Sequence, residues 1–231
     1  MLHKYDDALL TFREALNIRR HALGHLHPST ASIYNNIGCV HLEFNEEREA
    51  RRAFEAALDV QRNALCYEPD SRPLLFGTST TLCNLAYLYT FREMHEKAAL
   101  LLKEALELQE RVLGKTHTTV LSTLDSLADA YGKGGDNNSA MKHFNDIIDR
   151  LLDSEKGSII LNPNRSRALA IVYYKISRFH HKQNDLDAAL CALKKSWSFV
   201  DRVSSTELQN KIKNEINKMD GKLKNVDMDW I

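Results

Sequence analysis

The features of this sequence that suggest catalysis, metal binding or phosphate binding are its ten histidines, its four cysteines and one glycine-rich segment. Residues 132–135, Gly-Lys-Gly-Gly, have the composition of a phosphate-binding loop, but they lack its six-residue frame and the Ser or Thr that follows the lysine. Three histidines lie in predicted linkers, and the adjacent His180 and His181 face different sides of a predicted helix. No His-Glu-x-x-His motif, nucleophile elbow or Cys/His zinc spacing occurs. We therefore expect no enzyme activity, no metal and no cofactor.

The four cysteines also give no reactive pattern. Cys39, Cys66, Cys83 and Cys191 are scattered without Cys-x-x-Cys spacing, and a disulfide framework would need denser cysteines in a smaller secreted chain. The first residues lack the layout of a signal peptide, and no run approaches the roughly 20 apolar residues of a spanning helix. We expect a cytoplasmic protein with no membrane partner.

The balance of charge argues against a nucleic-acid partner. The 231 residues contain 31 Lys plus Arg and 31 Asp plus Glu, so the formal net charge is zero. Nucleic-acid binders normally carry a basic excess. The length and the 43% hydrophobic content are sufficient for a substantial buried core.

One alanine recurs along the chain in a similar context. The five positions, separated by 42, 48, 42 and 49 residues, are Ala8, Ala50, Ala98, Ala140 and Ala189. Four residues after each stands a large apolar side chain: Phe12, Phe54, Leu102, Phe144 and Leu193. A repeat of this size predicts a stacked array of helix pairs rather than a globule around one centre.

The repeat resembles a known family. Residues 82–105 read Leu-x-x-Leu-Ala-x-x-Tyr and then Ala-x-x-x-Leu-x-x-Ala, which resembles the tetratricopeptide repeat. Residues 23–30 and 113–120 resemble the Leu-Gly-x-x-His-Pro linker of kinesin light chain-type repeats. The resemblance covers roughly residues 4–200. It implies an all-α fold, an α-solenoid of antiparallel helix pairs with a C-terminal capping helix.

The predicted array spans residues 1–203. It contains a half repeat and four full repeats, at residues 4–30, 31–72, 78–120, 121–153 and 166–203. Residues 204–231 form a capping helix and tail, because the apolar positions 208, 212, 216, 219 and 223 fall on one helix face. The longer linkers, 66–77 and 153–165, are either passive insertions or binding loops.

In the family's fold the first helix of each pair lines a concave surface, so the resemblance places the binding residues there. Asn36 and Asn84 occupy equivalent slots, and an amide can pair with both the C=O and the N–H of an extended peptide. Alternatively, the two amides satisfy neighbouring helix ends or face water. The candidate peptide-binding residues are Asn35, Asn36, Asn84, Tyr87, Phe91, Asp125, Asp129, Lys175 and Arg178.

The resemblance implies a non-catalytic adaptor or scaffold that binds an extended peptide or a partner helix in this groove. The groove would change from polar to acidic at Asp125 and Asp129, and then to basic at Lys175 and Arg178, which would orient a partner. One alternative is a structural self-association module, with a homodimer formed through the uncapped N-terminal half repeat. Another is the regulatory repeat region of a larger protein.

Overall fold

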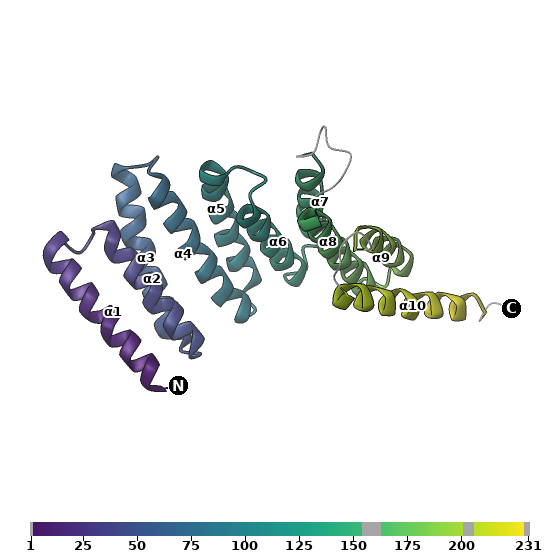
Figure 1. The fold of residues 1–231 in the computed structure, drawn as a ribbon, viewed down its shortest axis with the longest axis horizontal. Helices are drawn as coiled ribbons and strands as arrows, with labels where there is room; N and C mark the ends of the chain where they lie inside the picture. Colours follow the sequence, from purple (N-terminus) through teal and green to yellow (C-terminus); the bar gives the residue numbers. More distant parts are fainter. Residues whose placement is uncertain (1, 154–162, 201–205, 229–231) are drawn as a thin grey trace. The chain divides into compact units, whose positions relative to one another are not determined.

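The computed structural model describes residues 2–153, 163–200 and 206–228, and within them every element is an α-helix (Figure 1). The predicted all-α class is confirmed. The contacts group the helices into two compact units, Met1–Asp136 and Asn137–Ile231. The predicted division at residue 203 stays a prediction, and most of the predicted linker 153–165 lies outside the described residues.

The first unit contains α1 (Leu2–Leu23), α2 (Pro28–Glu43), α3 (Glu47–Tyr67), α4 (Arg72–Phe91), α5 (His95–Leu113) and α6 (Thr118–Lys133). Each helix of this unit packs against the next one in the chain. In addition, α2 contacts α4, so the first helices of two neighbouring pairs touch directly. The helices therefore form a stack of hairpins, as the α-solenoid prediction requires.

The second unit contains α7 (Asn137–Asp153), α8 (Pro163–Lys182), α9 (Leu186–Val200) and α10 (Thr206–Met228). The helices α8 and α9 form a hairpin, and α10 packs on α9. Ile212 and Met219 of α10 are buried in one cluster with Leu193 and Val200 of α9. The last helix therefore covers the apolar face that α9 would otherwise expose, as predicted for a capping helix.

The recurring alanine fixes how closely the paired helices approach. Ala50, Ala98, Ala140 and Ala189 have no exposed surface, whereas Ala8 on α1 is half-buried. For example, Ala50 and Phe54 of α3 share a cluster with Leu85 and Leu88 of α4. The alanine slots thus lie in the contacts between helices, where a larger side chain would push the helices apart.

The turns that follow α2, α4, α6 and α8 share one backbone geometry. Asn45, Glu93 and Asn184 are the non-glycine residues with positive φ in the described parts of the chain, and Gly135 occupies the equivalent turn after α6. In each turn, the residue that follows the one with positive φ donates its backbone N–H to the carbonyl five residues earlier. The four hydrogen bonds run from Glu46 to His41, from Met94 to Tyr89, from Asp136 to Tyr131, and from Asp185 to His180. This pattern satisfies the last carbonyls of each first helix. The glycine-rich segment 132–135 therefore has a structural explanation.

The histidine linkers between pairs act as helix caps. Nδ1 of His27 and Nδ1 of His117 each accept a hydrogen bond, 3.2 Å long, from the backbone N–H two residues later. Each of these side chains thus satisfies one of the N–H groups that a helix start leaves without a partner. Gly24 and Gly114, which end the preceding helices, have φ of 90° and 82°, values that glycine adopts without strain. These contacts explain physically why the Leu-Gly-x-x-His pattern recurs.

The first helix is held on the stack by apolar and polar contacts together. Leu9 is buried with Ile33 and Ile37 of α2. The Tyr5 hydroxyl donates to the Glu46 carboxylate and lies 3.0 Å from Nδ1 of His41. Burial and the nearby Glu46 carboxylate raise the pKa of Tyr5 to about 12. The hydroxyl therefore keeps its proton, and with it this hydrogen bond, throughout the neutral range.

No helix in the described ranges combines the length and the apolar composition that a membrane span requires.

We predict that Gly38→Ala destabilises the protein, because a methyl group there would lie 2.5 Å from Cε1 of the fully buried Phe54. Overpacking of this kind costs about 1–3 kcal/mol. Gly77→Ala is the matched control: its nearest neighbour is the Gln61 amide nitrogen at 3.5 Å, and alanine is favoured in a helix by about 1 kcal/mol. Urea unfolding followed by circular dichroism should show opposite shifts of the midpoint, and equal shifts would contradict this packing.

Candidate functional site

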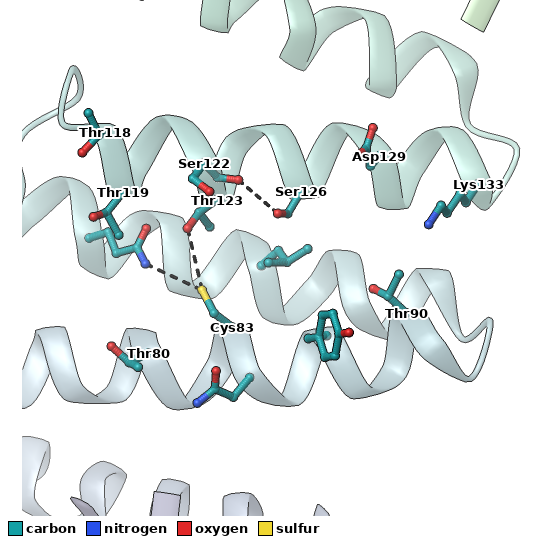
Figure 2. Close-up of a pocket in the computed structure, with 14 residues that line it drawn as sticks. Thr80, Cys83, Thr90, Thr118, Thr119, Ser122, Thr123, Ser126, Asp129 and Lys133 are labelled. Atoms are coloured by element: carbon teal, nitrogen blue, oxygen red, sulfur yellow. Dashed lines mark hydrogen bonds between the residues drawn. The ribbon is translucent and has the colours of Figure 1, made fainter. Parts of the chain in front are cut away.

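A groove of about 640 Å³ opens between α4 and α6, with α5 as its floor (Figure 2). The side chains from α4 are Thr80, Cys83, Asn84, Tyr87 and Thr90, and those from α5 are Leu102 and Gln109. The side chains from α6 are Thr118, Thr119, Ser122, Thr123, Ser126, Asp129 and Lys133. The groove lies entirely within the first unit. Most of the residues that line it are of polar, uncharged types, with one carboxylate and one ammonium group.

Cys83 bridges the three helices of the groove. Its Sγ lies 3.7 Å from Oγ1 of Thr123 on α6 (Figure 2) and accepts a hydrogen bond from Nε2 of Gln109 on α5 at 3.6 Å. Burial raises the pKa of the Cys83 thiol, and the two hydrogen bonds only partly oppose this effect. Neither partner is a base that could take the thiol proton, so this cysteine holds the helices together and is not an activated nucleophile.

Three hydroxyl groups of the groove direct their protons away from it. The hydroxyls of Thr80, Thr90 and Ser126 donate to backbone carbonyls one turn earlier in their own helices, at 2.9–3.0 Å. A hydroxyl has one proton and two lone pairs. These three groups therefore present only acceptor sites to the groove.

The amide of Asn84 is oriented by the neighbouring repeat. Its Nδ2 donates to Oδ1 of Asn35 at 3.0 Å and to Sγ of Cys39 at 3.5 Å, both on α2. Burial, and then the nearby Glu43 carboxylate, raise the pKa of the Cys39 thiol. Because both N–H bonds of Asn84 are in use, its Oδ1 is the atom that remains for a ligand.

Gln109 on the floor has an acceptor without a partner. Its side chain is only 2% exposed, and its Oε1 makes no hydrogen bond with any described residue. Gln61 on α3 has the same property and lies 11 residues after the alanine of its repeat, as Gln109 does. Only Gln109 lines the groove. A buried acceptor without a partner costs about 1–3 kcal/mol, and a ligand donor would relieve that cost.

The structure brings together some of the residues predicted from the sequence. Asn84, Tyr87 and Asp129 line the groove, and Asn35 lies behind Asn84 as its hydrogen-bond partner. Other predicted residues of the first unit lie outside the lining: the exposed Asn36 and Phe91, and the half-buried Asp125. In the second unit, α8 carries Lys175, which is half-buried, and Arg178, which is exposed.

Sequence reasoning missed the floor of the groove. Gln109 and Thr123 have the pattern of ordinary helix positions, whereas Thr80, Ser122 and Ser126 of the lining lie on the groove-facing side that the resemblance implies. One signal was available: a glutamine stands at the same position of two successive repeats, on the otherwise apolar stripe of the second helix. Among the described residues, no three His, Cys, Asp or Glu side chains lie close enough together to hold a metal ion.

Comparison with known proteins gives a family and a fold. The tetratricopeptide repeat model matches residues 1–63 and 77–153. A crystal structure of nearly identical TPR-like repeats from a putative kinesin light chain of Podosopora anserina is 16% identical, with a TM-score of 0.64, and the match covers 87% of this chain and 92% of that one. The structure of BtubC (BKLC) from P. vanneervenii is 12% identical, with a TM-score of 0.62, and the match covers 96% and 91%.

A curated relative is much longer than this chain. The clustered mitochondria protein homolog of Candida albicans is 26% identical over 166 residues, which are 72% of this chain. The match spans only 11% of that protein's length. The relationship therefore concerns one part of the larger protein.

We predict that Cys83 reacts with iodoacetamide several-fold more slowly at neutral pH than the exposed Cys66 and Cys191, because burial raises its pKa and the reagent attacks the thiolate. The rate at Cys83 should keep rising with pH beyond 9, where an ordinary thiol levels off. Mass spectrometry of peptides after timed labelling measures each rate, and urea should make the three rates similar. Faster labelling of Cys83 than of Cys66 in the folded protein would contradict the described environment.

Proposed function

The chain belongs to the tetratricopeptide repeat family, and from this premise we propose that it holds an extended segment of a partner protein in the groove between α4 and α6. The predicted resemblance to kinesin light chain-type repeats is confirmed. Repeats of this family generally mediate protein–protein interactions, because stacked helix pairs create long concave surfaces. The observation that carries the proposal is an open groove with hydrogen-bond acceptors that the protein itself leaves unused.

The dimensions of the groove suit an extended chain. Helix α6 has 16 residues, which corresponds to about 24 Å at roughly 1.5 Å per residue. An extended peptide covers this length with about seven residues, at roughly 3.3 Å each. Polar groups along both walls could then pair with the peptide backbone, while the exposed ring of Tyr87 contacts a side chain.

The chemistry of the lining supports binding without catalysis. Cys83 has no base beside it, and the family's folds are typically non-enzymatic scaffolds. The cytoplasmic location expected from the sequence stays a prediction, as does a contribution from Lys175 and Arg178.

We predict that the double variant Asn84→Ala, Tyr87→Ala loses partner capture while keeping its fold. Tyr87 is 63% exposed, so its removal should hardly change the free energy of unfolding. Loss of the Asn84 hydrogen bonds should cost about 1 kcal/mol. Removing two central contacts should weaken binding at least tenfold, about 1.4 kcal/mol. The test compares the proteins captured from a native lysate by the wild type and by the variant.

The control for this experiment is a second double variant, Tyr67→Ala with Leu100→Ala. Both side chains are strongly exposed, at 81% and 69%, and neither lines the groove. It should capture the same proteins as the wild type. If the groove variant and the control retain the same partners, the groove is not the binding site.

A second candidate function, self-association, rests on the exposed face of α1. Leu10 and Ile18 are 57% and 67% exposed and lie two turns apart on that helix. An apolar face of this kind is typical of a surface that contacts another chain. The homodimer expected from the sequence would use it.

We predict that, if α1 forms this contact, Leu10→Glu with Ile18→Glu converts a dimer into a monomer without loss of helicity, because two charges cannot be buried in an apolar contact. Light scattering after size-exclusion chromatography measures the mass. If the wild-type protein at high concentration has a measured mass of 26.4 kDa, the mass of one chain, the dimer is excluded.

A further inference from the structure

We propose that the groove between α4 and α6 selects a partner segment that carries a basic side chain, arginine above all, which lies against Tyr87 and Asp129. This inference rests on the proposed function and adds the chemistry of the segment.

Four polar side chains of the lining offer the same kind of hydrogen-bonding atom to a ligand. The hydroxyl protons of Thr80, Thr90 and Ser126 are committed to their own helices. Both N–H bonds of Asn84 point to α2. The atoms that these four residues offer to a ligand are therefore oxygens with free lone pairs, and the matching ligand is rich in N–H donors.

The floor of the groove repeats this polarity. Gln109 uses Nε2 on Cys83, so the atom left without a partner is again an acceptor, Oε1. The side chain is almost completely buried, which makes the missing hydrogen bond costly in the unliganded protein. A donor that reaches the floor from the groove would satisfy Oε1.

Charge and aromatic surface favour a cationic donor. The Asp129 carboxylate is on α6, and the exposed Tyr87 ring stands at the corresponding position on α4, 42 residues earlier. A guanidinium group can stack on a tyrosine face while it donates to a carboxylate. Lys133 is the cation among the lining residues, and it lies in the last turn of α6, where the helix carbonyls favour a positive charge.

The neighbouring helices strengthen this preference. The helices α2, α4 and α6 together carry three carboxylates, Glu43, Asp125 and Asp129, and two Lys or Arg side chains. Both cations are at helix ends, and the guanidinium of one of them, Arg72, donates to the Val112 carbonyl. An acidic segment would meet the acceptor oxygens of Thr80, Thr90, Ser126 and Asn84 and the Asp129 carboxylate, so the groove disfavours it.

The proposal is tested by selecting a phage library of random ten-residue peptides against the full chain and sequencing the peptides that bind. The proposal expects Arg plus Lys to be enriched about threefold or more at one position relative to the unselected library. Enrichment of Asp and Glu, or of uncharged residues alone, would overturn the basic-segment inference and leave the peptide-binding function standing. Failure to enrich any peptide would overturn the peptide-binding function, and the inference with it.

Point variants then locate the contact, with the most enriched peptide synthesised and labelled for fluorescence anisotropy. Asp129→Asn should weaken binding about tenfold. Gln109→Met should weaken binding several-fold without lowering the melting temperature, because methionine fills the same space without leaving a buried acceptor that has no partner. Two matched controls should bind as the wild type does: Gln61→Met, and Asp59→Asn on the exposed face of α3. Equal losses for each variant and its control would overturn the assignment.

Salt gives an independent readout. Binding of the basic peptide should weaken from 50 to 500 mM NaCl, because added ions screen the attraction to Asp129. The slope of affinity against salt should be smaller for Asp129→Asn than for the wild type. An unchanged slope in that variant would show that Asp129 does not contact the cation.

Discussion

A single helix of this chain cannot bury its own apolar stripe, and the whole structure depends on neighbouring helices coming close enough to do it together. Alanine at one slot of each repeat removes the side chain that would keep the helices apart. Gly38 goes further, since the ring of Phe54 occupies the space that a methyl group would need. Because these contacts join neighbouring helices, each unit grows by the addition of helices to a stack.

Close packing of the pairs also creates the groove. Once α2, α4 and α6 are held side by side by the second helices behind them, their remaining faces form a shared polar surface. The hydrogen bonds from Asn84 to Asn35 and Cys39, and the link from Cys83 to Thr123 and Gln109, connect one repeat to the next across this surface. The groove is therefore a fixed part of the stack and requires no separate loop to build it.

The same internal hydrogen bonds give the groove its chemical character. Each proton that a lining side chain donates inside the protein leaves an oxygen for the ligand, and the effect is repeated along α4 and α6. A surface of this kind distinguishes ligands by their donors more than by their size. Within a family that shares its fold among many functions, such differences in the lining determine what each array binds.

The sequence by itself determined the all-α class, the repeat and the role of its small residues, because the alanine period and the helix caps depend on local contacts that recur in every pair. It also indicated that Asn84, Tyr87 and Asp129 belong to one surface, since the family's fold assigns that surface to the first helix of each pair. Only the tertiary structure decided which hydrogen-bonding atoms of the Asn84 and Gln109 amides are left for a ligand. Whether an amide oxygen or an amide nitrogen faces the groove depends on partners 45–49 residues away, and the orphan acceptor of Gln109 exists only because three helices close around it. Side-chain hydrogen bonds between one repeat and the next have no periodic signal, so a pattern of residue types cannot reveal them.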